Sequence, residues 1–136
     1  MKRYLLDTNI CIFFIKGQYA LNQKIKEIGE QNWFISEMTV AELKYGIENS
    51  KTMEAMRIIV EAFIPKFAII SIYNSLDIYA KEKAKLRKKD LLIDDFDILI
   101  GSTAVANNMT MVSNNVRHLS RLDAIVLEDW TTLAKK

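Results

Sequence analysis

The chain has 136 residues, of which half are hydrophobic, a formal net charge of +2 and a single cysteine. This length suits one domain spanning residues 1–136, with enough apolar side chains for a core without disulfides or structural metals. No apolar run reaches the roughly 18 residues that a membrane-spanning helix needs. The N-terminal apolar stretch is broken by Asp7 and Asn9, which is unlike a signal peptide. We therefore expect a cytoplasmic protein with no membrane partner.

Short apolar runs alternate with longer stretches of helical periodicity along the chain. In chain order they predict a strand at Tyr4–Leu6, helices at Ile10–Ile15 and Tyr19–Gly29, a strand at Trp33–Ile35, helices at Thr39–Asn49 and Met53–Phe63, a buried strand at Phe67–Ile72, helices at Ser75–Lys89 and Phe96–Asn107, and strands at Thr110–Ser113 and Ala124–Leu127. Pro65 is expected to end the helix before it. Strands separated by helices pair in parallel through crossover connections, so the pattern predicts a three-layer α/β/α sandwich with a mainly parallel central sheet.

Three carboxylates lie inside apolar sequence, where an ionised side chain is costly unless it is paired or bound to a metal. Asp7 follows Leu5–Leu6, Glu42 lies in TVAEL and Asp97 lies in FDILI. Each is near a helix start that a parallel sheet directs toward the crevice at the carboxyl ends of its strands. Carboxylates that meet there repel one another unless a cation lies between them. Oxygen ligands without a His or Cys cluster favour Mg²⁺ or Mn²⁺ over zinc.

Each of these acids also has a purely structural interpretation as a helix cap. Asp7 and Asp97 can accept hydrogen bonds from the first amides of a helix, and Glu42 ends the sequence TVAE, which has the spacing of a capping box. Asp94 and Asp95 are either charges that stabilise a helix start or additional acids of the site. The convergence of the three acids favours the shared site over three independent caps.

Other residues have open interpretations. The segment from Lys81 to Lys89, KEKAKLRKK, holds six basic residues and is either a solvated helix face or a surface that contacts phosphates. His118 is expected at the surface rather than as a general base, and Cys11 is expected in the core. Three hydroxyl side chains are expected to hold the carboxylates through hydrogen bonds: Thr8, Ser36 and Ser113.

Four segments carry a family signature: LLDTNICIFFIK, ISEMTVAELKYGIENS, IDDFDILIGSTAVANNMTMVSNN and the later EDW. Together they resemble the PIN-domain nucleases, most closely the toxin half of VapBC-type toxin–antitoxin pairs, from residue 4 to about residue 130. The resemblance implies a divalent-metal site that cuts RNA, a homodimer, and a cognate antitoxin that blocks the site. The Ile10–Ile15 and Met53–Phe63 helices, if not wholly in the core, would then form the dimer interface and the antitoxin groove.

By this resemblance, Asp7 matches the first family acid in LDTN, Glu42 the second in AEL, and Asp97 the third in DILI. Many members have a fourth acid after the fourth strand, where this chain has Asn115, whose amide oxygen can orient water or contact a metal weakly but brings no charge. The implied mechanism is phosphodiester hydrolysis with one Mg²⁺, or Mn²⁺ in its place, on Asp7 and Asp97 and on Glu42 directly or through water. The alternative, which Asn115 favours, is a PIN-fold interaction protein with weak catalysis.

Overall fold

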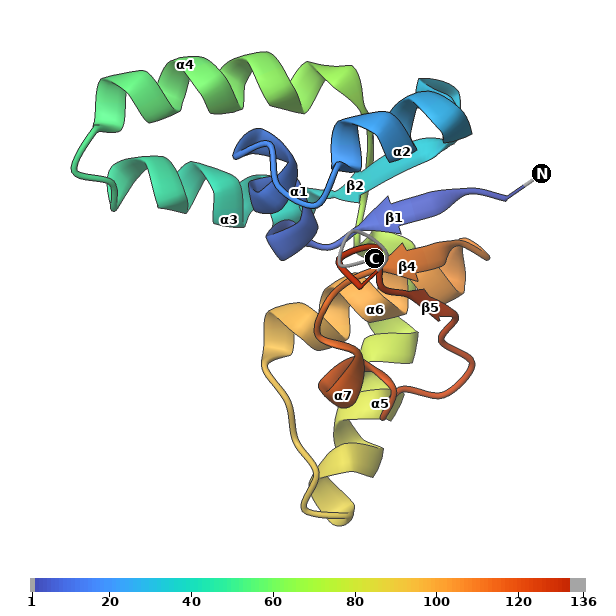
Figure 1. The fold of residues 1–136 in the computed structure, drawn as a ribbon. Coiled ribbons are helices and arrows are strands. Elements are labelled where there is room, and N and C mark those ends of the chain that lie inside the picture. The colour runs from blue at the N-terminus through green and yellow to red at the C-terminus, as the bar shows by residue number, and fades with distance from the viewer. Residues whose placement is uncertain (1, 133–136) are drawn as a thin grey trace.

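The protein is described here by a computed structural model, which covers residues 2–132. Within these residues one sheet has five strands, all parallel, in the order β3–β2–β1–β4–β5 (Figure 1). The strands are β1 (Tyr4–Leu6), β2 (Trp33–Ser36), β3 (Ala68–Ile70), β4 (Thr110–Val112) and β5 (Leu127–Glu128). The predicted parallel sheet is therefore confirmed.

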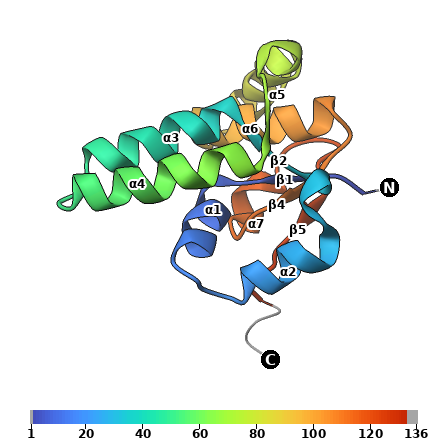
Figure 2. The ribbon, with the colours of Figure 1, turned by 90° about the horizontal axis from the view of Figure 1, so that it is seen from above.

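Helices connect the strands and cover both faces of the sheet. They are α1 (Thr8–Ile15), α2 (Leu21–Ile28), α3 (Glu37–Glu48), α4 (Met53–Phe63), α5 (Leu76–Lys88), α6 (Asp95–Ala106) and α7 (Val116–Leu119), with 3-10 turns at Glu30–Asn32, Ile64–Lys66 and Tyr73–Ser75. Figure 2 shows α1 and α2 on the opposite side of the strands from α5 and α6. Most predicted helix ends lie within about two residues of the observed ones.

The alternation of side chains along the strands divides the core into two halves. Leu6 packs with Ile10 and other residues from α1 to α4 on one face, whereas Leu5 packs with Leu86 of α5 and Ile98 of α6 on the other. All residues of β1 and β4 are buried, as expected for central strands of a parallel sheet that is covered on both faces. This confirms the predicted three-layer α/β/α sandwich.

Two strand predictions are wrong in part. The strand predicted at Phe67–Ile72 is reduced to β3, and it is not buried, because β3 is an edge strand in which Ile69 is 48% exposed. The strand predicted at Ala124–Leu127 begins only at Leu127, because Ala124 has a φ of +62°, in the left-handed region that a strand excludes. The hydrophobic pattern alone does not show which apolar run will lie at an edge.

The carboxyl ends of β1, β2 and β4 lie at one edge of the sheet, where α1 and α3 begin. The backbone N–H of Asp7 donates to the carbonyl of Val112 at 2.9 Å, so the ends of β1 and β4 are joined directly. The α3–α4 hairpin extends beyond this edge (Figure 1). No helix among residues 2–132 combines the length and apolarity needed to cross a bilayer.

Candidate active site

Asp7 comes directly after β1 and is only 3% exposed. Its Oδ1 accepts the backbone N–H of Thr8 at 2.8 Å, and its Oδ2 accepts the hydroxyl of Ser113 at 2.7 Å. Burial raises the pKa of the Asp7 carboxyl, and these two hydrogen bonds oppose the rise. Asp7 is thus both the N-cap of α1 and a buried acid at the end of a central strand.

Glu42 lies on α3 and is half-buried. The Thr8 hydroxyl donates a short hydrogen bond to Glu42 Oε1, and the same hydroxyl oxygen lies 3.1 Å from Thr39 Oγ1. Burial raises the pKa of Glu42, and the negative charges of Asp7 and Asp94 raise it further. The capping-box interpretation is wrong, because α3 is capped one turn earlier by Ser36, whose Oγ accepts the N–H of residue 38 at 3.0 Å.

Asp97 lies in the first turn of α6, but it is not the cap of that helix. Asp94 takes that role, since its Oδ2 accepts the backbone N–H of Phe96 at 3.2 Å. The Asp97 carboxylate is instead turned toward Asn115, whose Nδ2 donates to Asp97 Oδ2 at 3.3 Å. Burial, followed by the charges of nearby acids including Asp7, raises the pKa of Asp97 to about 6.

The structure brings the three predicted acids into one pocket of about 360 Å³, lined by Asp7, Thr8, Asn9, Ile12, Glu42, Tyr45, Gly46 and Asp97. None of these lining residues is basic. No side-chain cation in the lining therefore balances the negative charges that raise the pKa values of Glu42 and Asp97. Carboxylate oxygens without a histidine or cysteine partner fit Mg²⁺ or Mn²⁺ by their chemistry. Within residues 2–132, however, no three acidic, histidine or cysteine side chains already form a ligand cage.

The hydroxyl side chains have different roles from one another. Ser113 and Thr8 hold the carboxylates of Asp7 and Glu42, as the sequence predicts. Ser36 does not, because its hydroxyl oxygen is used in the cap of α3. The amide nitrogen of Asn115 faces Asp97. A contact of its amide oxygen with water or a metal stays a prediction.

The remaining candidates lie outside the pocket. Asp95 accepts hydrogen bonds from Lys83 and the Tyr79 hydroxyl, each at 2.9 Å, so it is a helix-start charge rather than a member of the site. His118 is exposed on α7 and Cys11 is fully buried, as predicted.

The basic run that begins in α5 divides into paired and exposed side chains. Lys83 pairs with Asp95, and Lys85 pairs with Glu82 at 3.0 Å and with Asp123 at 2.8 Å, so these two lysines are engaged in ion pairs within the chain. Four other basic side chains of the run are exposed and remain candidates for phosphate contacts: Lys81, Arg87, Lys88 and Lys89.

Sequence reasoning missed four residues that line the pocket: Asn9, Ile12, Tyr45 and Gly46. Tyr45 is 68% exposed and lies three residues after Glu42, so the helical spacing places both on one face of α3. Asn9 and Ile12 come from the first turns of α1, immediately after Asp7. Their proximity in sequence to the two acids was the available signal.

The geometry agrees with the comparisons to known proteins. Residues 4–125 match the PIN domain, and the chain therefore belongs to the PIN-domain family. Ribonuclease VapC2 of Rickettsia felis is 34% identical over 130 residues, which cover 93% of this chain and 97% of that protein. The tRNA(fMet)-specific endonuclease VapC of Salmonella typhimurium is 30% identical, over 96% of this chain and 99% of that protein. Within the family, the chain is thus of the VapC type.

Solved structures support the same grouping. VapBC2 from Rickettsia felis, bound to a DNA fragment from its promoter, superposes with a TM-score of 0.85 at 32% identity over 93% of this chain and 98% of that chain. DNA-bound VapBC from Salmonella typhimurium gives a TM-score of 0.87 at 29% identity, over 96% and 99% of the two chains. The fold is therefore the PIN-like fold of those complexes.

Proposed function

We propose that the chain is a metal-dependent endoribonuclease, the toxin of a type II toxin–antitoxin pair. The observation that carries this proposal is the convergence of Asp7, Glu42 and Asp97 in one pocket lined by no basic residue, in a chain of the VapC type. The relatives in Rickettsia felis and Salmonella typhimurium are named as a ribonuclease and a tRNA endonuclease, which supports RNA as the substrate. The cytoplasm, where such RNA is found, is the proposed site of action.

The carboxylates would hold Mg²⁺, with Mn²⁺ as a substitute. Asp7 and Asp97 are the proposed direct ligands, and Glu42 acts directly or through water. A bound ion of this kind lowers the pKa of a coordinated water and neutralises charge on the scissile phosphate. Ser113 and Thr8 orient the carboxylates of Asp7 and Glu42, so that little reorganisation is needed when substrate binds.

The test is RNA cleavage by the purified chain with Mg²⁺, with EDTA, and after Asp7→Asn. Asp77→Asn is the matched control. It makes the same chemical change at an exposed residue of α5. Cleavage is expected for the wild type and the control only, and only with the metal. Cleavage by Asp7→Asn near the wild-type rate would refute the assignment. Mapping of cleaved ends in total RNA identifies the target.

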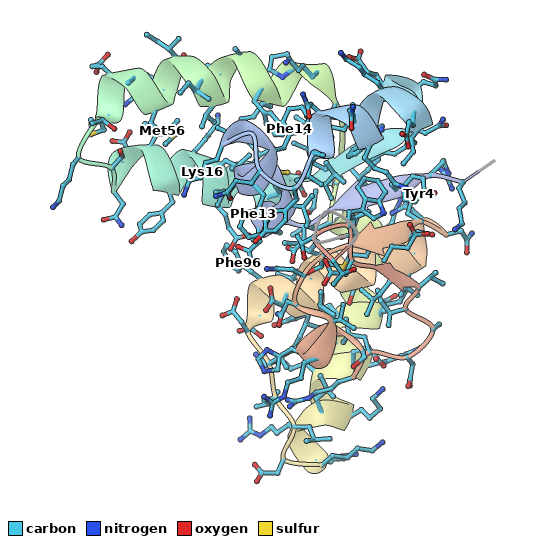
Figure 3. All side chains as sticks on the ribbon, in the orientation of Figure 1. Tyr4, Phe13, Phe14, Lys16, Met56 and Phe96 are labelled. Atoms are coloured by element: carbon cyan, nitrogen blue, oxygen red, sulfur yellow. The ribbon has the colours of Figure 1, made fainter. Side chains whose placement is uncertain are left out.

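A second pocket supports an antitoxin partner. It measures about 220 Å³, lies between α1, α3 and α4, and is lined mainly by apolar side chains: Ile12, Ile15, Lys16, Glu42, Leu43, Gly46, Met56 and Val60. Figure 3 labels two of these lining residues, Lys16 directly after α1 and Met56 on α4. Because Glu42 lines both pockets, a segment lying in the apolar pocket can place a basic side chain among the carboxylates.

Mixing the chain with the product of its neighbouring gene tests this partner. RNA cleavage is expected to be lost when the complex is saturated, and cleavage that persists would exclude that product as the antitoxin. A homodimer is also proposed, since Ile58 and Ile59 of α4 are 71% and 45% exposed. Light scattering is expected to give twice the mass of one chain, and a monomer's mass after Ile58→Glu.

The alternative is a PIN-fold interaction protein with weak catalysis, which Asn115 at the fourth acidic position favours. Calorimetry with Mg²⁺ separates the two functions. Binding of the ion together with RNA cleavage supports the nuclease, whereas a chain that binds no Mg²⁺ supports the interaction protein.

A further inference from the structure

Asn115 occupies the N-cap position of α7 but does not cap it. Asparagine is among the residues most favoured at this position, because its side chain can accept the free amides of the first turn. Here the side chain makes no capping hydrogen bond. Its Nδ2 donates to Asp97 Oδ2 at 3.3 Å instead, across to the first turn of α6. The amide is thus used on an acid of the pocket rather than on its own helix.

The backbone of Asn115 is connected to the other principal acid. Its N–H donates to Ser113 Oγ at 2.9 Å, and Ser113 Oγ donates to Asp7 Oδ2 at 2.7 Å. A hydroxyl has one proton. Because the Ser113 oxygen accepts the amide, its proton is directed to Asp7. The short segment from Ser113 to Asn115 therefore holds both Asp7 and Asp97.

We infer that Asn115 is a positioning residue, which holds Asp97 through a donated hydrogen bond that a carboxylate at this position cannot make. The inference deepens the proposed nuclease function and rests on it for its catalytic meaning. An ionised aspartate only accepts hydrogen bonds. At position 115 it would face the carboxylate of Asp97 as a further negative charge beside a pocket whose lining includes no basic residue. Asparagine keeps the number of carboxylates at three while fixing the direction of Asp97.

A structural role in α7 predicts the opposite behaviour. If Asn115 only supported the start of that helix, Asn115→Asp would be neutral, because aspartate and asparagine cap helices about equally well. Asn115→Ala would then be the more damaging change. The order of these two variants therefore separates the two roles.

The test is thermal unfolding of the full chain in EDTA. The expected order of midpoints is wild type, then Asn115→Ala, then Asn115→Asp, because alanine removes a hydrogen bond and aspartate adds repulsion as well. The matched control is Asn114→Asp, which adds the same charge one residue away. Asn114 is exposed and its Oδ1 only accepts a hydrogen bond, from Asn9 at 3.5 Å, which aspartate can also do. Any other order of the three midpoints, or an equal loss in the control, overturns the inference.

Calorimetric titration with Mg²⁺ alone gives a second measurement. Asn115→Ala is expected to weaken binding about 10- to 100-fold, as do losses of other groups that orient metal ligands. Unchanged affinity would overturn the inference. Neither measurement uses RNA, so the two proposals can fail separately. If the variants unfold in the expected order but the wild type cleaves no RNA, the proposed function is refuted and the positioning of Asp97 is still supported.

Discussion

Replacement of Asp97 by asparagine is expected to stabilise the metal-free protein and to abolish its response to Mg²⁺. The pKa of Asp97 is raised from 3.8 to about 6, first by burial and then by the charges of Asp7, Asp94 and Glu42. An acid with a raised pKa in the folded state is harder to ionise there than in the unfolded chain. At neutral pH the ionised Asp97 therefore opposes folding.

The size of this effect follows from the pKa. A rise from 3.8 to about 6 corresponds to about 3 kcal/mol for a fully buried group. Asp97 is only half-buried, so solvent screens its charge and we expect about 1–2 kcal/mol. In a chain of this length, 1 kcal/mol shifts the unfolding midpoint by about 3–5 °C. Asp97→Asn should therefore raise the midpoint in EDTA at pH 7 by about 3–10 °C, since asparagine keeps an oxygen for the hydrogen bond from Asn115.

The direction of the pH dependence can be worked out in the same way. Between pH 3.8 and about 6 the folded state binds more protons at Asp97 than the unfolded state. The contribution of Asp97 to stability therefore becomes more unfavourable as pH rises through this window, and stays so above it. The advantage of Asp97→Asn over the wild type should be full at pH 7 and should shrink as the pH falls toward 4.

Thermal unfolding of both proteins, with EDTA and with Mg²⁺, is the assay. The control is Asp95→Asn in the same helical turn, because hydrogen bonds from Lys83 and Tyr79 lower the pKa of Asp95 and its charge favours folding. That variant should be no more stable than the wild type. Mg²⁺ should raise the midpoint of the wild type but not of Asp97→Asn. The reasoning is refuted if Asp97→Asn is no more stable than the wild type in EDTA at pH 7, or if Asp95→Asn stabilises equally.

Three further changes follow from the contacts. Ser113→Ala removes the hydroxyl that donates to Asp7, so RNA cleavage with Mg²⁺ should fall about 10- to 100-fold with an unchanged circular dichroism spectrum; a wild-type rate would contradict this role. Lys88 and Lys89 are exposed and are expected to contact phosphates. Changing both to alanine should make the slope of log binding constant against log salt concentration shallower by about 1–2, measured for RNA by fluorescence anisotropy. Glu82→Gln should lower the free energy of unfolding in urea by about 1–3 kcal/mol, because the buried Glu82 accepts charged and backbone hydrogen bonds; equal stability would show that these bonds contribute nothing.

The alternation of apolar runs was sufficient to predict the parallel sheet and the helices that cover it. Periodicity is a local property, and central strands such as Leu5–Leu6 are apolar on both faces because both are covered. The three acids could be found for a similar reason, since a carboxylate inside apolar sequence requires a partner. The exposed edge position of Ile69 could not be predicted, because it depends on the order of strands in the sheet.

The sequence by itself thus determined the layers of the fold and the identity of the acids Asp7, Glu42 and Asp97. Only the tertiary structure decided what each side chain contacts: Ser36 rather than Thr39 caps α3, and Asn115 turns its amide nitrogen to Asp97. The Ser36 cap is local and the Asn115 contact joins two elements, but each depends on which competing hydrogen-bond partner is within reach after folding. The element that contains a residue follows from local pattern, whereas the direction of its side chain follows from the packed neighbours.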